Sequence, residues 1–523
     1  MADAAAKTVT GAEAIIGSLA ASGVTACFAN PGTSEMHLVT ALDREPRIRS
    51  VLCLFEGVAT GAADGFARVA GVPALTLLHL GPGYLNGGAN IHNARRAYSP
   101  VINLIGDHAV THRKLDAPLA SDIAGLAGPN SIWLKSVDRV EDAGRLAVEA
   151  FTASYGPPPG PVSLIMPADT AWTKGASVAK AGARPGLKAP EAAVVEEAAK
   201  AARKAAKPAI LINGTGLHAH GIAALRRIEA ASVRVLSDTF MAHHARGGGR
   251  YVAARLPYFA EMAVDTLAGV DLLLIAGTKP PVAFFAYPNT PSEFTPAGAK
   301  TISLGGPETD SATALSMLAD ALGAPKLPDA SWTRPEAPKD GAFNPHTIGL
   351  SLAAYLPDGA LISDDGVTAS LPIYVNLEKA AHHEWLGLTG GAIGQGMPVA
   401  IGAAVARPDV KTICFSGDGA AMYTVQSLWT MARENLDVLT IVFVNHAYRI
   451  LKIELARTGA GNPGPAASGM LSLGSPEIDW VKLAEGMGVG AEACSSVAQF
   501  NDALARAMAT RGPRLIAAMI PGS

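Results

Sequence analysis

Two oxygen-bearing side chains follow apolar runs near the C-terminal end of the sequence. Asp418 lies in Gly417-Asp418-Gly419 directly after the run at 412–415, and Asn445 follows the run at 438–444. A helical pattern separates the runs, which predicts a strand, a helix and a second strand. Parallel strands bring their carboxyl ends to one sheet edge, where a carboxylate, an amide oxygen and glycine amides suit Mg²⁺ with a phosphate. The alternative is an ordinary strand-to-helix turn in which Asp418 caps the helix.

Two further titratable side chains also follow apolar runs, in the N-terminal third of the sequence. Glu56 opens a helical pattern rich in glycine and alanine, and His79 ends the run at 74–79. A carboxylate at such a place is costly unless something uses it, because burial favours its neutral form. A histidine gains or loses a proton near neutral pH, which suits acid–base chemistry. The alternatives are a glutamate that faces a helix dipole and a structural histidine.

The elements that must position these residues form an α/β pattern. Strand-length apolar runs alternate with helical patterns, at 26–29, 50–55, 74–79, 101–105 and 162–165 and then at 209–212, 233–236, 272–275 and 301–304. The linker at 174–190 is rich in alanine, lysine and proline, and the linker at 324–345 is rich in proline. We predict three domains, at 1–175, 190–325 and 340–523, each a mainly parallel sheet flanked by helices.

The composition excludes several classes of protein. Of the 523 residues 49% are hydrophobic and 17% are charged, which suits a large buried core and argues against disorder. The net charge is −3 without a long basic run, so we predict no nucleic-acid partner. The N-terminus lacks a signal-peptide pattern and no apolar run reaches the ~18 residues of a membrane span, so we expect a cytoplasmic protein with no membrane partner. Four scattered cysteines are expected to be core thiols.

The separation of Asp418 and Asn445 (445 − 418 = 27 residues) resembles the cofactor motif of the thiamine-diphosphate-dependent decarboxylase and acetolactate synthase superfamily. The family usually has two adjacent asparagines, whereas this chain has Val444-Asn445-His446. The resemblance implies that Mg²⁺ binds to Asp418, Asn445 and the backbone carbonyl of Ala447. It also implies a wider set of residues around thiamine diphosphate: Asn30, Pro31, Gly32, Glu56, Thr368, Gly391, Ile393, Gly417, Asp418, Gly419, Ala420, Ala421, Asn445, Ala447 and Tyr448.

The N-terminal segment resembles the pyrimidine-binding domain of the same superfamily. NPGTSE at 30–35 and FEGVATGAADGFAR at 55–68 are close to the benzoylformate decarboxylase pattern. The resemblance implies that Glu56 hydrogen-bonds the aminopyrimidine of the cofactor and helps to remove the thiazolium proton. His79 stands 23 residues after Glu56 (79 − 56 = 23), a spacing that implies a role in substrate positioning or proton transfer, and Thr33 is placed to bind the substrate carboxylate. Glu56, His79 and Thr33 are the expected catalytic residues.

The expected activity is addition of the cofactor ylid to a 2-oxo acid with loss of CO₂, followed by release of an aldehyde or a 2-hydroxy ketone. An acetolactate synthase-like carboligase is the first hypothesis, and a non-ligating decarboxylase of the benzoylformate type or an aldehyde lyase is the alternative. A catalytically silent regulatory homologue is the non-enzyme alternative. FAD binding is not expected. Relatives assemble each site across two subunits, which implies a homodimer or homotetramer.

Several residues keep an open role. The segment 280–288 has no histidine where benzoylformate decarboxylases carry a second one, so Phe284, Phe285 or Ala286 would face the site. His92, His112, His243 and His244 are weaker candidates, and the last two are as well suited to the surface. Glu454 either contacts a polar substrate group or pairs with Arg457.

Overall fold

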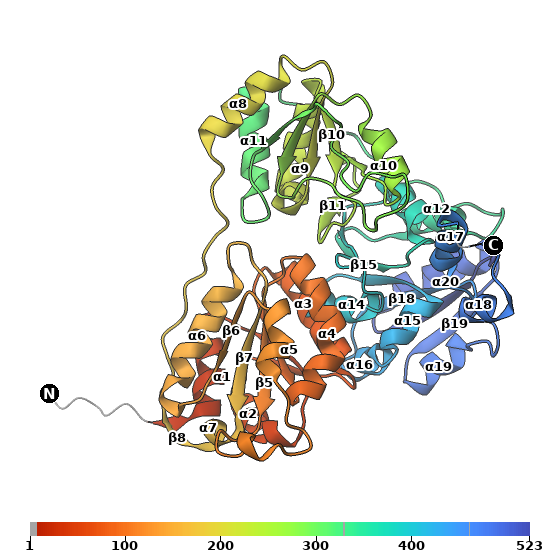
Figure 1. The fold of residues 1–523 in the computed structure, drawn as a ribbon. Helices are drawn as coiled ribbons and strands as arrows, with labels where there is room; N and C mark the ends of the chain where they lie inside the picture. Colours follow the sequence, from red (N-terminus) through yellow and green to blue (C-terminus); the bar gives the residue numbers. More distant parts are fainter. Residues whose placement is uncertain (1–7, 328–329, 460, 523) are drawn as a thin grey trace.

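The computed structural model describes residues 8–327, 330–459 and 461–522. Residues 1–7 of the N-terminal segment and residues 328–329 of the expected linker lie outside the described residues. The described chain forms three large sheets with helices on their faces, and long connections join them (Figure 1). The predicted α/β fold class is therefore confirmed, while the domain boundaries stay a prediction.

The first sheet has the strand order β3-β2-β4-β5-β7-β6 with every pair parallel. Its strand β6 was not predicted, because Trp133–Ser136 is only partly buried and has no apolar run. The strands are β2 (Ala26–Asn30), β3 (Arg49–Leu52), β4 (Ala74–Leu78), β5 (Val101–Asp107), β6 (Trp133–Ser136) and β7 (Pro161–Pro167), and β1 (Val9–Thr10) pairs separately with β8 (Lys174–Ala176). The helices are α1 (Gly11–Ser22), α2 (Met36–Asp43), α3 (Glu56–Ala70), α4 (Leu80–Arg96), α5 (Ile123–Ala127), α6 (Ala143–Ser154) and α7 (Ala168–Trp172).

The middle sheet is also parallel, in the order β12-β10-β9-β13-β14. Its strands are β9 (Pro208–Ile212), β10 (Arg234–Ser237), β12 (Ala254–Arg255), β13 (Leu272–Ala276) and β14 (Lys300–Ser303), with helices α8 (Ala192–Ala202), α9 (Ala219–Ala230), α10 (Ala260–Leu267) and α11 (Ser311–Ala321). One strand of this segment, β11 (His244–Arg246), instead pairs antiparallel with β16 of the third sheet. The middle segment is therefore joined to the third sheet by backbone hydrogen bonds.

The third sheet has the order β11-β16-β15-β17-β18-β20-β19, with all strands after β11 parallel. Its own strands are β15 (Ala360–Asp365), β16 (His383–Leu386), β17 (Thr412–Gly417), β18 (Val438–Val444), β19 (Gly490–Cys494) and β20 (Arg514–Met519). The helices are α12 (Pro345–Tyr355), α13 (Ser370–Asn376), α14 (Gly396–Ala406), α15 (Asp418–Ala421), α16 (Ser427–Arg433), α17 (Arg449–Arg457), α18 (Pro465–Met470), α19 (Trp480–Gly486) and α20 (Val497–Ala509). The predicted helix after Asp418 is thus divided into the short α15 and α16.

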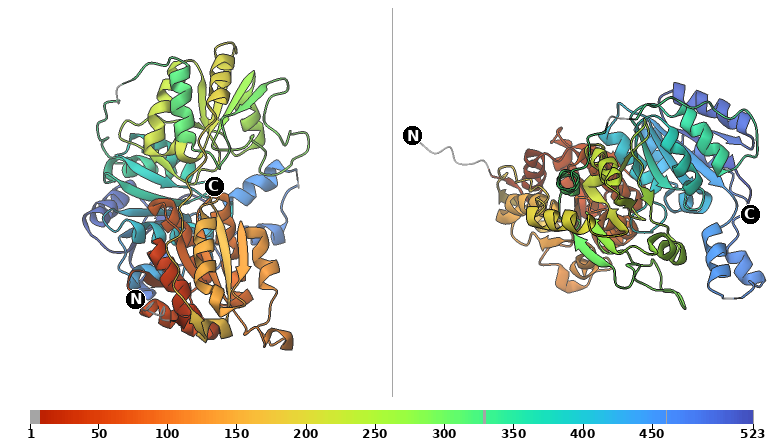
Figure 2. Two further views of the ribbon diagram at one scale, coloured as in Figure 1. Left: turned by 90° about the vertical axis from the view of Figure 1, so that its left-hand side faces the viewer. Right: turned by 90° about the horizontal axis from the view of Figure 1, so that it is seen from above.

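The first and third parts of the chain meet where α3 packs against α14, and they stay side by side in the further views of Figure 2. Glycines set the short distance between the two helices. A Cβ atom added at Gly65 would lie 2.2 Å from the carbonyl oxygen of Val399, and one added at Gly402 would lie 1.9 Å from that of Ala62. The glycine-rich sequences around Glu56 and after Ile393 therefore serve this contact, which fixes the two loops relative to each other.

Two global expectations can be compared with the structure. All four cysteines are buried free thiols, as predicted. Within the described ranges, no helix has both the length and the apolar character that crossing a bilayer requires.

Candidate active site

Asp418 and Asn445 lie side by side at the carboxyl edge of the third sheet. They follow β17 and β18, which are adjacent parallel strands. One carboxylate oxygen of Asp418 accepts hydrogen bonds from the backbone N–H groups of Asn445 (3.1 Å) and His446 (2.7 Å), and the other accepts from that of Gly419 (2.9 Å). The predicted meeting of the two strand ends is therefore present, and Asp418 itself ties them together.

The donor groups at this edge fit a hard divalent cation. Asp418 is 3% exposed, and burial raises the pKa of its carboxyl group against the opposing effect of the three N–H donors. A cation would offset that burial, and the carboxylate oxygen that accepts only the N–H of Gly419 has a second lone pair to offer. Among the described residues no three His, Cys, Asp or Glu side chains cluster as metal ligands, so a cation here would depend on Asp418 with amide and carbonyl oxygens. Space beside Gly417 is open, since a Cβ atom there would meet nothing within 4 Å.

The remaining predicted cofactor residues of the third sheet surround the same edge. Thr368 lies in the turn after β15, the strand next to β17, and Ala420 and Ala421 belong to α15. Tyr448 packs its ring on Gly419, where an added Cβ would lie 2.4 Å from the ring. The side-chain oxygen of Asn445 accepts the backbone N–H of Ala447 at 3.0 Å.

A buried aspartate that sequence reasoning missed supports the loop that contains Ile393. Asp365 ends β15, is 1% exposed, and accepts the backbone N–H groups of Gly394 (2.7 Å) and Gly396 (3.2 Å) through one oxygen. Burial raises the pKa of Asp365 to about 7, and the like charge of Asp364 adds to the rise. Its other oxygen has no hydrogen-bond partner among the described residues.

Glu56 begins α3 and is 7% exposed. Its carboxylate accepts a hydrogen bond from the side-chain amide of Asn86 on α4 at 3.0 Å. A Cβ atom added at Gly83 would lie 3.4 Å from the other carboxylate oxygen, so the glycine leaves room beside it. Glu56 is therefore a buried carboxylate with one polar side-chain contact, placed at the end of α3 that faces the start of α4.

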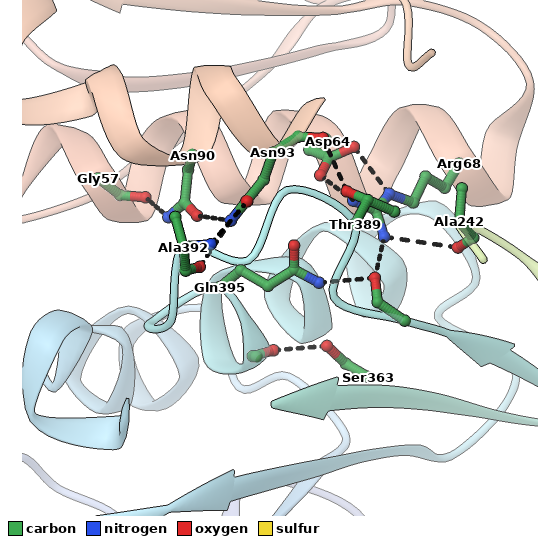
Figure 3. A network of polar contacts seen from close by, with 12 residues as sticks. Gly57, Asp64, Arg68, Asn90, Asn93, Ala242, Ser363, Thr389, Ala392 and Gln395 are labelled. Carbon is green, nitrogen blue, oxygen red and sulfur yellow. Dashed lines mark hydrogen bonds and ion pairs between the residues drawn. The ribbon is translucent and has the colours of Figure 1, made fainter. Parts of the chain in front are cut away.

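A polar network connects the helix of Glu56 with the loop of Ile393 (Figure 3). Asn90 donates to the carbonyl of Gly57 (2.7 Å), Asn93 donates to Asn90 (3.1 Å), and Asn93 also donates to the carbonyl of Ala392 (2.8 Å). The network therefore runs from the residue after Glu56 to the residue before Ile393. The two asparagines had no signal in the sequence, because their partners lie about 30 and 300 positions away.

The same loop is also held by a buried ion pair. Arg68 and Asp64, one turn apart on α3, are both almost fully buried. Arg68 further donates to the carbonyl of Gly387 at 2.7 Å. It also donates to the hydroxyl of Thr389 (3.2 Å) and to the carbonyl of Ala242 (3.4 Å), as Figure 3 shows. Gly387 and Thr389 belong to the loop before α14 and Ala242 belongs to the middle segment, so the pair on α3 fixes the loop and also contacts the middle segment.

The loop after β2 brings Thr33 near His79. Asn30 ends β2, Pro31 and Gly32 follow, and Thr33 begins a short 3₁₀ turn. A Cβ atom added at Gly32 would lie 2.2 Å from the Nδ1 atom of His79, so the two segments are in contact. Nδ1 of His79 lies 2.8 Å from a carboxylate oxygen of Glu35, a fully buried residue that sequence reasoning did not select.

Phe284 is the residue of segment 280–288 that reaches the glycine loop. Its ring would lie 2.6 Å from a Cβ atom at Gly391. Ring centroids of Phe240, Tyr258 and Phe285 lie 5.2, 5.3 and 4.8 Å from that of Phe284, which makes a partly exposed aromatic cluster. Of the residues expected to face the site, Phe284, Phe285 or Ala286, Phe284 therefore lies beside Gly391, and which of them faces a substrate stays a prediction.

Helix α17 follows the Asn445 loop and contacts the middle segment through polar groups. Glu454 lies 3.5 Å from Arg457 and also accepts a hydrogen bond from the Tyr287 hydroxyl at 2.8 Å. Arg457 stacks over Phe259 at 3.9 Å and pairs with Glu261. Glu454 is therefore engaged in the pairing with Arg457 that the sequence suggested.

The four remaining candidate histidines differ in their surroundings. Nε2 of His92 lies 3.1 Å from the carbonyl oxygen of Gly390, whereas His112 is exposed and stacks with His108. The surface position considered for His243 and His244 is wrong, because strand pairing buries this segment: His244 is 1% exposed, and His243 is partly buried and contacts Glu384 at 3.0 Å. Burial also lowers the pKa of His244, so the neutral ring is favoured.

The glycine turn of the middle sheet is occupied by the side chains of the chain itself. Backbone N–H groups of Gly214 and Gly216 donate to the side chains of Asn213 (2.9 Å) and Ser311 (2.8 Å). The hydroxyl of Thr215 donates to Asp310 at 2.7 Å. A nucleotide phosphate here would have to displace these contacts, and the expectation that FAD is not bound stays a prediction.

Comparisons with known proteins agree with this geometry. The N-terminal thiamine pyrophosphate-binding domain model of thiamine pyrophosphate enzymes matches residues 9–126, and the C-terminal one matches 374–518. IlvX of Mycobacterium tuberculosis, which bears a provisional name as an acetolactate synthase large subunit, is 46% identical over 98% of this chain and 99% of its own. Benzoylformate decarboxylase of Pseudomonas aeruginosa is 28% identical over 94% of this chain and 96% of its own.

A solved structure shares the fold at lower identity. The thiamine diphosphate-dependent 4-hydroxybenzoylformate decarboxylase of Rhodococcus jostii RHA1 superposes with a TM-score of 0.84 at 24% identity, and the match covers 98% of this chain and 100% of that chain. The two matched domains contain Glu56 and the pair Asp418 and Asn445, respectively. The chain therefore belongs to the thiamine pyrophosphate-dependent enzymes, in the group that includes acetolactate synthases and benzoylformate decarboxylases.

Proposed function

We propose that the protein is a thiamine-diphosphate- and Mg²⁺-dependent enzyme that decarboxylates a 2-oxo acid and transfers the remaining acyl unit to a second carbonyl. The observation that carries this proposal is the pairing of Asp418 and Asn445 at adjacent strand ends. Their oxygens, with the carbonyl of Ala447, would hold Mg²⁺ and through it the diphosphate. Thr368 and the amides of Ala420 and Ala421 would bind the phosphate oxygens.

The side chains of the first domain would handle protons and the substrate. When bound, thiamine diphosphate supplies the carbanion that attacks the 2-oxo carbonyl and accepts the electron pair left by CO₂. Glu56 would exchange a proton with the aminopyrimidine, which its burial at the start of α3 favours because few other partners compete. Ile393 would pack against the cofactor, while Thr33 and His79 would orient the 2-oxo acid and move protons at its oxygen.

A second candidate is a non-ligating decarboxylase that releases an aldehyde. The aromatic cluster around Phe284 favours it, since the cluster lies beside Gly391 and offers apolar surface to a large acyl group. Pyruvate, with only a methyl group, would leave this surface uncovered. The two candidates share the first half of the reaction and differ in what removes the acyl unit.

We also propose that two subunits complete each site. Large apolar side chains are exposed directly beside predicted site residues on both domains: Leu54 and Leu85 are 45% and 60% exposed, and Met422 and Tyr423 are 40% and 54% exposed. Apolar surface of this kind commonly marks a subunit interface. The proposed assembly is a homodimer or a homotetramer.

The test is to incubate the protein with thiamine diphosphate, Mg²⁺ and either pyruvate or benzoylformate, and to identify products by mass spectrometry. Acetolactate from pyruvate supports the first candidate, and benzaldehyde from benzoylformate supports the second. Omission of Mg²⁺ should abolish turnover in either case. If neither these two substrates nor any 2-oxo acid of a wider panel is converted, the proposal is contradicted.

The variant Glu56→Gln separates the proposed proton transfer from folding. It keeps the size of the side chain and its hydrogen bond with Asn86, but it cannot take up a proton. We expect a loss of turnover of about 100-fold or more with unchanged cofactor affinity, in the range that general acid–base groups contribute. Unchanged turnover would contradict the role of Glu56.

A further inference from the structure

A second buried carboxylate lies beside the predicted catalytic residues of the first domain. Glu35 precedes α2 and its side chain is fully buried. One carboxylate oxygen accepts the backbone N–H of Gly32 at 2.8 Å and lies 2.8 Å from Nδ1 of His79. The other oxygen accepts the hydroxyl of Ser34 at 2.5 Å. A carboxylate removed from water in this way is costly unless each contact stabilises its charge.

The backbone around this pair is shaped to admit it. A Cβ atom added at Gly106 would lie 1.7 Å from an oxygen of Glu35, and one added at Gly32 would lie 2.2 Å from Nδ1 of His79. Any side chain at either position would displace the carboxylate or the imidazole. Two separate segments, the loop after β2 and the end of β5, therefore leave space for Glu35 and His79 to meet.

The geometry fixes which ring nitrogen of His79 carries the proton. An ionised carboxylate only accepts hydrogen bonds, so the atom that faces Glu35 must be Nδ1–H. The Nε2 atom then has a free lone pair in the neutral ring, and it is the nitrogen that can exchange a proton. The side chain of His79 is 21% exposed, whereas that of Glu35 is fully buried.

The other charged groups near Glu35 and His79 either pair with another residue or are separated from the imidazole by the backbone. Glu56 on α3 lies beyond Gly83, whose Cβ position is 3.3 Å from Cβ of His79 and 3.4 Å from the Glu56 carboxylate. Asp107, at the end of β5, pairs with Arg113 at 2.7 Å. The direct charged contact of the imidazole among the described residues is therefore Glu35.

We propose that Glu35 is the positioning residue for His79: it holds the ring in the Nδ1–H tautomer and directs Nε2 towards the 2-oxo acid. This inference rests on the proposed function for the role of His79, and it adds a residue that acts through His79. The carboxylate orients the ring and stabilises the cation that forms when Nε2 takes up a proton. When Nε2 returns that proton to a substrate oxygen, the ring becomes neutral again and Glu35 remains ionised.

The test compares Glu35→Gln, Glu35→Asp and His79→Gln with the control Glu45→Gln, which changes a partly buried glutamate paired with Arg47. Steady-state kinetics are measured with the 2-oxo acid that the wild type converts, and thiamine diphosphate affinity is measured by fluorescence titration. Glu35→Gln is expected to lower kcat by about 10- to 100-fold, as loss of an outer-shell carboxylate does, with KM and cofactor affinity within about threefold. The control should match the wild type.

The tautomer provides a measurement that does not depend on turnover. Protein labelled with ¹⁵N-histidine is recorded by long-range ¹H–¹⁵N spectroscopy, and the His79 signals are those lost in His79→Gln. The Nδ1–H form is expected in the wild type, and a shift towards Nε2–H is expected in Glu35→Gln because a glutamine amide can donate to Nδ1. This readout tests the positioning by Glu35 even in a protein without activity.

The outcomes distinguish the positioning from the function. Wild-type kcat and an unchanged tautomer in Glu35→Gln would overturn the proposal, and so would a parallel loss of kcat, cofactor affinity and thermal stability, which indicates a merely structural role. If Glu35→Gln does not fold, Glu35→Asp decides by kinetics: a lower kcat with KM and cofactor affinity within about threefold supports the positioning, and a wild-type kcat overturns it. A wild type without thiamine-diphosphate-dependent turnover overturns the proposed function alone, since the tautomer measurement still reports on Glu35.

Discussion

Replacement of Asp365 by asparagine tests how the buried carboxylate beneath the Ile393 loop affects stability. Burial raises the pKa of Asp365 from 3.8 to about 7 in the folded protein. A carboxyl group whose pKa is higher when folded binds its proton more tightly in the native state. Its contribution to stability is therefore complete below pH 3.8 and is lost as the pH rises towards 7.

The magnitude follows from the two pKa values. Between pH 5 and pH 8 the folded carboxyl group loses its proton, whereas the unfolded group is ionised throughout. The two pH units between 5 and 7 correspond to about 3 kcal/mol, at roughly 1.4 kcal/mol per unit. Asparagine has no titration, so the variant should lack this part of the pH dependence. Its amide oxygen can still accept the N–H groups of Gly394 and Gly396, which favours correct folding.

The assay is urea unfolding at pH 5, 6, 7 and 8 without cofactor, followed by tryptophan fluorescence. Cofactor is omitted because ligand binding shifts apparent stability. Groups other than Asp365 titrate in both proteins, so the difference between wild type and Asp365→Asn isolates this carboxylate. The exposed Asp340, changed to asparagine, is the matched control. Equal pH dependence of Asp365→Asn and wild type would refute the reasoning, because the native state would then hold the carboxylate ionised at pH 5.

Two other expectations concern the proposed sharing of sites between subunits and the contact of α3 with α14. Each site is proposed to combine Glu56 of one subunit with Asp418 of another, so co-refolding the inactive variants Glu56→Gln and Asp418→Ala should restore about a quarter of wild-type activity. Half of the dimers would then be mixed, and each mixed dimer would have one intact site of two. No recovery of activity would place each site within one chain. Gly402→Ala is expected to lower the free energy of unfolding by about 2 kcal/mol or more, because its Cβ would lie 1.9 Å from the Ala62 carbonyl oxygen. Gly88→Ala, in open space on α4, should be neutral or slightly stabilising in the same thermal and urea unfolding measurements.

Much of the cofactor edge was predictable because it depends on local rules. Asp418 and Asn445 each follow a buried apolar strand, and successive parallel strands place such residues at the same edge. Glu56 stood out for a related reason, since a carboxylate directly after an apolar run is exceptional. The family resemblance added the roles, whereas the juxtaposition of Asp418 and Asn445 was already implied by strand order.

Contacts between distant segments were not predictable. Glu35 belongs to the quoted sequence NPGTSE, yet its partner His79 lies 44 positions later and no periodic pattern connects them. The pairing of β11 with the third sheet was missed for the same reason, since three residues carry too little pattern to identify a strand partner. The network through Asn90 and Asn93 likewise joins helix α4 to a loop about 300 positions away.

The sequence alone determined the fold class, the strand ends and the residue types that suit a metal and a diphosphate, because periodicity and strand order follow from near neighbours along the chain. Only the tertiary structure decided which buried polar groups satisfy one another. It placed Glu35 beside His79 and Asp365 beneath the Ile393 loop. The physical reason is that a buried charge or amide must find its partner across packed helices and sheets, where distance along the chain has no bearing on distance in space.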